Sequence, residues 1–162
     1  MYSWRVTKYN PIHRDVDGTY KNQDEWTSYS DIGRNVHKDE YLSTEENYIN
    51  AIFAFMEEMN IAMMYLNALE LKSDGVKEQN ASVFLYNLWV GKAVSKREIK
   101  KLAKLTLRET IWCKLSSKKD FFVHFGYDYY MYIGAIYDCP NARLKIEDSG
   151  LFVEKYTSPY MD

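Results

Sequence analysis

The sequence predicts an α+β domain in which an antiparallel β-sheet, ending in a C-terminal meander, packs against two or three helices. Before residue 108, apolar residues recur every three or four positions, as they do along one buried face of a helix. After residue 108, short β-branched and aromatic runs alternate with turn residues, which is typical of strands. A chain of 162 residues, 46% of them hydrophobic, is long enough for one core, so we expect residues 1–162 to form a single domain.

The first thirty residues are predicted to contain a strand and a long polar loop. Residues 2–7 alternate between apolar and polar side chains, which favours a half-buried strand, and the pair Asn10-Pro11 ends it. The polar residues 15–25 have little to bury, so we expect a loop with a hairpin turn at Asp17-Gly18. Residues 27–30 are expected to form a second, short strand.

The first helix is predicted to begin at Ser43, which is spaced to form a capping box with Glu46. Its apolar residues follow the spacing of one buried face and are Ile49, Ile52, Phe53, Met56 and Met59. We expect Glu45, Glu46, Glu57 and Glu58 to remain in water. This helix therefore covers the core with one face only.

Residues 64–71 are expected to form a strand, although the same residues could prolong a helix. A further helix is predicted over residues 82–90, and Gly91 ends it. Ser95 and Glu98 form a second capping box, which opens a basic amphipathic helix whose lysines face the solvent.

Short apolar runs after residue 108 predict the strands of the meander, over residues 110–115, 121–125, 129–137, 143–146 and 151–156. Serine, glycine and proline residues separate these runs and favour turns between the strands. We expect neighbouring strands of the meander to pair with one another.

Residues 121–134, which we call the aromatic hairpin, are expected to place different side chains on the two faces of the sheet. A three-residue turn at 126–128 would pair Phe125 with Tyr129, so that alternate residues form one apolar face. The opposite face then carries rings with polar tips, from Phe122, His124, Tyr130 and Tyr132. We expect either a helix of this chain or a partner to cover that face.

Composition and motifs argue against several classes of function. The 21 basic and 23 acidic residues give a net charge of -2, which argues against a nucleic-acid partner. No apolar stretch is long enough to span a membrane and no secretion signal is recognisable, so we expect a cytoplasmic protein with no membrane partner. Cys113 and Cys139 are expected to be free thiols. Because no catalytic, cofactor or metal motif is found, we expect no enzyme activity, no cofactor and no metal site.

Charge is distributed unevenly along the chain. Residues 1–60 contain eleven acidic and six basic residues, a net charge of -5. Several of these acids lie in predicted loops beside aromatic rings, a combination that attracts and then holds a basic protein. The candidate partner-binding residues are Asp24, Glu25, Trp26, Tyr29 and Asp31, together with Tyr127, Tyr130 and Tyr132 of the aromatic hairpin.

Four segments carry a family resemblance: WRVTKY at 4–9, DEWTSYSDIG at 24–33, HFGYDYYMY at 124–132 and GLFVE at 150–154. With these segments the chain resembles, over almost its whole length, small bacterial immunity proteins that protect cells from contact-dependent or polymorphic toxins. The resemblance implies a cytoplasmic protein that binds one cognate toxin domain and has no catalytic residues, and it assigns no residue to the toxin contact. We therefore expect a toxin-neutralising protein that occludes a toxin domain, a nuclease, through its acidic and aromatic surface.

Two other interpretations stay open at this point. An enzyme or small-molecule-binding protein would have a pocket beside the aromatic hairpin, with His124 and Tyr130 at its lip. A structural or regulatory module would bury its aromatic face in a homodimer. The sequence does not determine the identity of the toxin, the surface that binds it or the oligomeric state.

Overall fold

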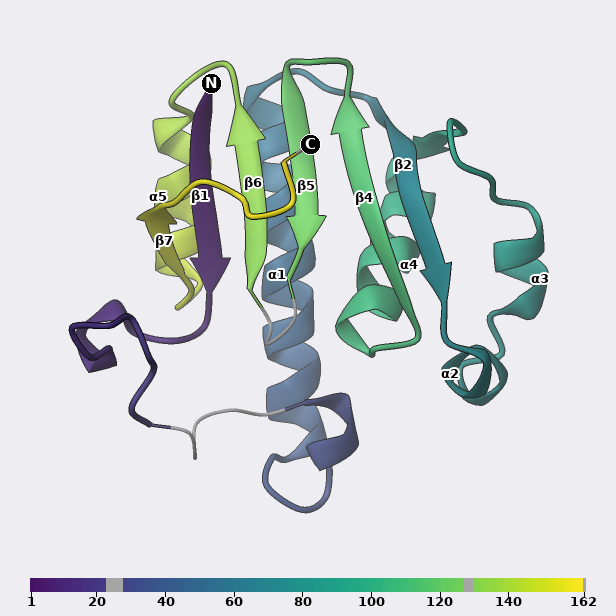
Figure 1. Cartoon of the computed structure of the whole chain (residues 1–162), viewed down its shortest axis with the longest axis horizontal. Coiled ribbons are helices and arrows are strands. Elements are labelled where there is room, and N and C mark those ends of the chain that lie inside the picture. Colours follow the sequence, from purple (N-terminus) through teal and green to yellow (C-terminus); the bar gives the residue numbers. More distant parts are fainter. Residues whose placement is uncertain (23–27, 127–129, 162) are drawn as a thin grey trace.

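The computed structural model describes residues 1–22, 28–126 and 130–161, and it confirms the α+β fold. Seven strands form one antiparallel sheet in the order β3-β2-β4-β5-β6-β1-β7 (Figure 1). The strands are β1 (Tyr2–Thr7), β2 (Met63–Leu71), β3 (Ala93–Ser95), β4 (Ile111–Ser117), β5 (Phe121–Phe125), β6 (Met131–Ala135) and β7 (Phe152–Lys155). The predicted meander is β4-β5-β6, and the N-terminal strand β1 lies between β6 and β7.

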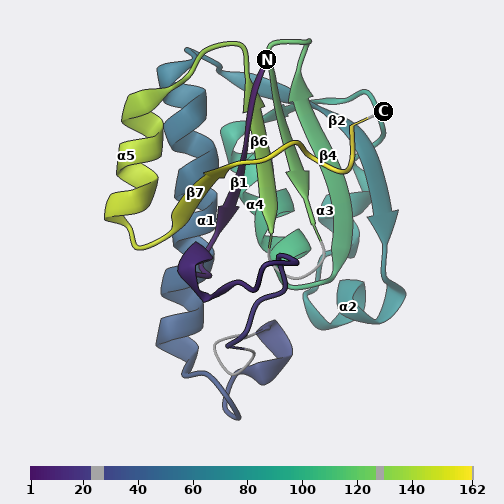
Figure 2. The ribbon, with the colours of Figure 1, turned by 60° about the vertical axis from the view of Figure 1, so that its left-hand side comes forward.

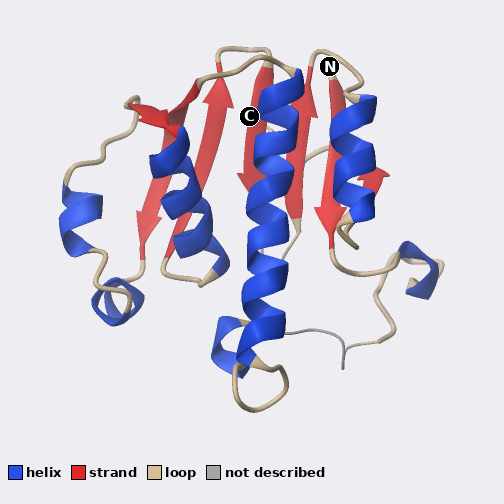
Figure 3. Cartoon of the chain, turned by 180° about the vertical axis from the view of Figure 1, so that it is seen from behind, coloured by secondary structure: helices blue, strands red, loops and turns tan. Residues whose placement is uncertain are grey.

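Three helices cover one face of the sheet (Figure 3), namely α1 (Lys38–Glu58), α4 (Lys96–Leu107) and α5 (Pro140–Asp148). Two short helices, α2 (Ser73–Glu78) and α3 (Ser82–Tyr86), connect β2 to β3. The 3-10 helices η1 (Pro11–His13) and η3 (Tyr29–Asp31) belong to the segment between β1 and α1. Among the residues that the structure describes, none of the helices α1 to α5 covers the opposite face of the sheet, and the C-terminal residues 156–161 run across it (Figures 1 and 2).

The core lies between the sheet and the three helices. Alternate residues of the central strands face the helices and are fully buried, as Cys113, Val123 and Ile133 are. On α1, the predicted apolar residues Ile49, Ile52 and Met56 are buried against the sheet, whereas Phe53 and Met59 are only partly buried. The helical and strand periods of the sequence therefore predicted part of the core.

Several predicted elements are confirmed. β2 shows that residues 64–71 form a strand and do not prolong a helix. α4 begins at the predicted capping box, in which the Glu98 carboxylate accepts the Ser95 amide at 2.8 Å. The hairpin turn at Asp17-Gly18 is present, because Arg14 and Tyr20 form an antiparallel bridge around it.

The start predicted for the first helix is wrong. α1 begins at Lys38, so that Ser43 lies inside the helix and caps nothing. The longer helix buries Tyr41 and Tyr48, two rings that lie two turns apart on one face. It also buries Glu45, which we expected to remain in water.

The strand predicted over residues 143–146 is also wrong, because these residues belong to α5. Pro140 occupies the first turn, where its fixed backbone angle suits a helix and its missing N–H is not needed. The Glu58 carboxylate accepts the amide of Ala142 at 2.6 Å and so caps this helix from α1. Glu58 is therefore half-buried at this cap, whereas Glu57 is exposed as expected and pairs with Lys145 of α5 at 2.8 Å.

Three further predictions need correction. In the aromatic hairpin, Phe125 pairs with Met131 and not with Tyr129, so Gly126 and Tyr130 lie outside the ladder. The shift is by two residues, and each side chain therefore keeps the face that was predicted for it. The helix over residues 82–90 ends at Tyr86. In the segment 27–30, the part within the described residues forms the 3-10 helix η3 and no strand.

The two thiols are expected to be unreactive in the folded protein. Both are buried, and burial raises the pKa of Cys113 to about 12 and that of Cys139 to about 11. Because only the thiolate reacts, a disulfide reagent at pH 8 should label neither thiol until the chain is unfolded in guanidinium. The pKa of Cys113 in the folded protein lies above its ordinary value of 9.0. Its contribution to the free energy of unfolding is therefore fully present below pH 9 and is lost as the pH rises toward 12, because the unfolded chain ionises first. Rapid labelling of the native protein would contradict this assignment.

Candidate partner-binding surface

The predicted binding residues that the structure describes do not form one surface. Asp24, Glu25, Trp26 and Tyr127 lie outside the described residues. The other four fall into two groups on opposite sides of the sheet. Tyr29 and Asp31 lie in η3 beside the helices, whereas Tyr130 and Tyr132 lie on the helix-free face.

Asp31 holds its own turn together. Its carboxylate accepts hydrogen bonds from the amide of Ser28 at 2.7 Å, the hydroxyl of Ser28 at 2.8 Å and the side chain of Asn35 at 3.3 Å. The bond from the Ser28 amide is the main reason why the pKa of Asp31 lies below its ordinary value. Asp31 therefore stays charged, but its first role is structural.

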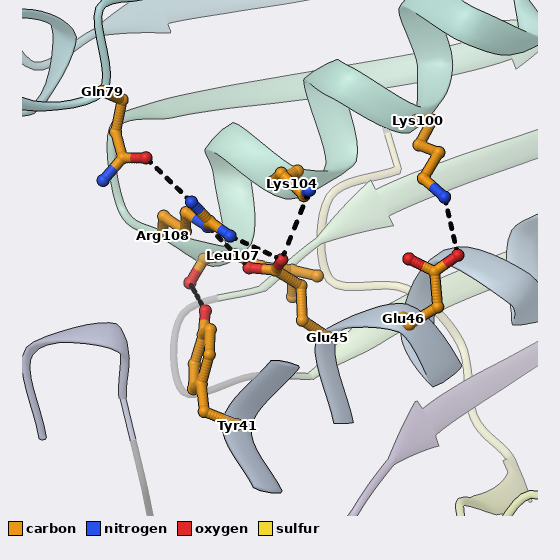
Figure 4. Close-up of polar contacts among 8 residues, drawn as sticks. All are labelled: Tyr41, Glu45, Glu46, Gln79, Lys100, Lys104, Leu107 and Arg108. Carbon is orange, nitrogen blue, oxygen red and sulfur yellow. Dashed lines mark hydrogen bonds and ion pairs between the residues drawn. The ribbon is translucent and has the colours of Figure 1, made fainter. Parts of the chain in front are cut away.

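Tyr29 packs against the ion pair between Glu45 of α1 and Arg108 at the end of α4. Figure 4 shows this ion pair. The Arg108 guanidinium donates to both oxygens of Glu45, at 2.7 and 2.9 Å, and to the Gln79 side-chain oxygen at 3.0 Å. These bonds to Glu45 raise the pKa of Arg108. The ring of Tyr29 lies 4.8 Å from the guanidinium carbon and 5.5 Å from the ring of Tyr41. The cluster fixes η3 against the helices, so Tyr29 also has a structural role.

The C-terminal residues of the chain cover the helix-free face of the aromatic hairpin. Tyr132 is only 6% exposed, its ring lies 5.9 Å from that of Tyr160, and burial raises its pKa to about 12. His124 is 8% exposed and its Nδ1 lies 2.9 Å from the hydroxyl of Ser158. The cover that we expected from a helix or a partner is thus a segment without regular structure, and Tyr132 is not available to a partner.

A cavity of about 110 Å³ lies between α4 and the aromatic hairpin. Tyr130 lines it, but His124 does not, so the two residues do not share the predicted lip. Two polar groups in its wall already have partners, since Trp112 Nε1 donates to the Phe125 carbonyl and Thr106 donates to the Leu102 carbonyl. The cavity is smaller than the roughly 300 Å³ that small-molecule sites usually need. It gives no specific support to a small-molecule function.

Residues 14–20, which we call the acidic finger, form an exposed hairpin with an apolar tip. The amide of Asp15 donates to the carbonyl of Thr19 at 2.9 Å, and Gly18 supplies the positive φ that the turn requires. The Asp17 carboxylate accepts the Thr19 amide at 2.9 Å, and this bond holds the pKa of Asp17 below its ordinary value. Val16 is fully exposed between the two aspartates.

The base of the acidic finger is anchored to the sheet. Arg14 is only 9% exposed and donates to Glu154 of β7 at 2.6 Å, and Glu154 also pairs with Arg5 of β1 at 3.0 Å. The ring of Tyr20 packs on that of Tyr9 at 4.9 Å. A recognition loop benefits from a fixed base and an exposed apolar residue. Because the loop is already ordered, it loses less conformational entropy when it binds.

Val16 is not among the predicted binding residues, although the sequence around it carries a signal. It is the one apolar residue between Asp15 and Asp17 at a predicted turn, where a turn by itself needs only polar residues and glycine. No sequence pattern near Arg14 indicates that Glu154, 140 residues later in the chain, anchors the base of the acidic finger.

Among residues 1–22, 28–126 and 130–161, no group of three or more His, Cys, Asp or Glu side chains is placed to hold a metal ion. Within the same residues no helix has the length and apolarity needed to cross a bilayer. No family model matches the chain, and neither a curated protein nor a solved structure matches it. The resemblance to immunity proteins therefore stays a prediction.

Proposed function

We propose that this protein is an immunity protein, which neutralises a toxin by binding a cognate toxin domain and occluding its active site. The acidic finger and the acidic segment that follows it would make the contact, and a nuclease would be the target. The observation that carries the proposal is the acidic finger as a whole, an anchored hairpin that holds two exposed aspartates and the side chain of Val16 in solvent.

Charge supports a basic target. Residues 11–40 contain seven acidic and four basic residues, a net charge of -3, and one of the four, Arg14, is buried against Glu154. A nuclease presents a basic cleft to the phosphates of its substrate, so an acidic surface accelerates the encounter and competes for the same cleft. Val16 would then fill an apolar position in the contact and slow dissociation.

The test is to co-purify the chain with the protein encoded next to its gene and to measure whether it inhibits that protein. The proposal expects a stable complex on size exclusion and loss of nucleic-acid cleavage at equimolar concentration. A neighbouring protein that cleaves nucleic acid equally well in the presence of the chain would overturn the proposal.

Two variants of the acidic finger separate the roles of charge and apolar contact. Asp15→Lys should lower the association rate about tenfold at low salt, and the difference should shrink as salt screens the charges. Val16→Ser should leave the association rate nearly unchanged and raise the dissociation rate about tenfold. Surface plasmon resonance on the isolated toxin domain measures both rates.

Asp120→Lys is the matched control, because Asp120 is exposed in the turn between β4 and β5, at the other end of the sheet (Figure 1). It makes the same change of net charge without touching the acidic finger. Equal loss of association rate in the Asp15 and Asp120 variants would show that overall charge, and not this surface, governs the encounter.

A further inference from the structure

We propose that α3, the residues that follow it and the first turns of α4 form a second interaction surface, which binds an acidic and apolar segment of a partner protein. Figure 1 shows α3 beyond β2, at the opposite edge of the sheet from the acidic finger. Three features of this surface support the proposal: exposed apolar side chains, a groove, and cations without an ion-pair partner among the described residues. None of these features involves the proposed toxin.

Four large apolar side chains within eight residues are exposed here. Val83, Tyr86, Trp89 and Val90 are between 59% and 90% exposed, while Leu85 and Leu88 of the same segment are buried in the core. The core therefore uses one side of the segment and leaves a second apolar side in water. Single exposed apolar residues are ordinary, but several together indicate an interaction site.

A groove of about 470 Å³ runs between α3 and the start of α4, and Val83 and Phe84 line its apolar part. Arg97 and Lys101 line it from α4, and the Lys101 ammonium lies 4.6 Å from the centre of the Phe84 ring. At the neighbouring Trp89, the Lys92 ammonium lies 5.3 Å from the ring centre. Apolar rings and cations therefore alternate along this surface.

The cations of the groove are not neutralised within it. Its carboxylate, Glu98, already accepts Lys92 at 2.7 Å and the Ser95 amide at 2.8 Å. Among the residues that the structure describes, neither Arg97 nor Lys101 has a carboxylate within ion-pair distance. Residues 72–104 contain eight basic and three acidic residues, a net charge of +5. A partner segment with carboxylates beside its apolar side chains complements both features.

The groove favours a protein segment over a nucleic acid. Its side-chain amides, Asn80 and Asn87, suit the backbone of a peptide, and the exposed aliphatic side chains of Val83 and Val90 suit apolar side chains of a protein partner.

The test uses a fluorescein-labelled peptide of three Glu-Glu-Leu-Phe repeats and the full chain, with anisotropy as readout. We expect saturable binding that weakens at least tenfold in both Trp89→Ala and Arg97→Glu, and that is unchanged in Lys119→Glu, an exposed cation in the β4–β5 turn. Unchanged melting temperatures of the variants would show that the exposed side chains act on binding and not on folding.

Three comparison probes decide the chemistry of the partner. A poly-glutamate peptide of equal length, a twelve-residue oligothymidylate and vesicles with phosphatidylglycerol should each bind more weakly than the Glu-Glu-Leu-Phe peptide. The proposal is overturned by absence of saturable binding, by equal binding of poly-glutamate, by tighter binding of the nucleic acid or the vesicles, or by insensitivity to both substitutions.

Discussion

Replacement of Glu45 by alanine is expected to lower the free energy of unfolding by about 3–5 kcal/mol. The Glu45 side chain is 3% exposed and that of Arg108 is 15% exposed, and two hydrogen bonds join them. Removing the carboxylate leaves a guanidinium buried without its counter-charge, and the unpaired charge, more than the lost bond, causes the loss. Urea denaturation followed by circular dichroism measures the change.

Glu46→Ala provides the matched control one residue away (Figure 4). Glu46 also pairs with a cation of α4, Lys100, at 2.7 Å, but both side chains are more than 40% exposed. Water screens this pair and solvates whichever charge remains, so the loss should be at most about 1 kcal/mol. Similar losses in the two variants would contradict the difference in burial on which the expectation rests.

Gly134→Ala is expected to destabilise the protein by about 1–3 kcal/mol, because it overpacks the helix-free face of the sheet. A Cβ at position 134 would lie 2.0 Å from a ring carbon of Phe122, the residue that pairs with it across the ladder. The ring has little room to move, since it is stacked on His124 at 4.4 Å and is only 6% exposed. Thermal unfolding of the variant measures the loss.

The double variant with Phe122→Ala identifies the cause of that loss. The three atoms nearest to a Cβ at position 134 all belong to the Phe122 ring, so the same substitution should cost less than about 0.5 kcal/mol in the Phe122→Ala background. An undiminished cost would mean that backbone properties of the glycine, and not the contact with Phe122, set its requirement.

Local periodicity explains why much of the fold could be predicted. Side chains that are buried against a sheet leave a local pattern in the sequence. This pattern is the alternation in residues 2–7 and the apolar run in residues 121–125, and both segments form strands within one residue of their predicted bounds. The Ser95 and Glu98 capping box is a signal contained within four residues, and it marked the start of α4 correctly.

Predictions failed where distant contacts decide the local structure. Residues 143–146 alternate as a strand does, but the α5 amides are capped by Glu58, more than 80 residues earlier in the chain. The start of α1 failed for a similar reason. Tyr41 gains burial through contacts with Tyr29 and with the Leu107 carbonyl, and no pattern around Ser43 records them.

The sequence indicates that the segment before α1 is acidic, but it does not indicate how the side chains of this segment are arranged. Acidic loops were recognisable from composition, yet Asp31 and Tyr29 turned out to hold η3 in place. The acidic finger depends on Arg14 and Glu154, which are 140 residues apart. Tyr132 lost its exposure to a C-terminal segment that has no strong sequence pattern of its own.

Growth of cells that express the neighbouring toxin shows whether the acidic finger neutralises it, when the wild-type chain is compared with the combined Asp15→Lys and Val16→Ser variant at equal expression. We expect the wild-type chain and Asp120→Lys both to restore growth and the combined variant to restore it only at much higher expression. Full protection by the combined variant at equal expression would contradict a neutralising contact through the acidic finger, and absence of protection by the wild-type chain would contradict the immunity function itself.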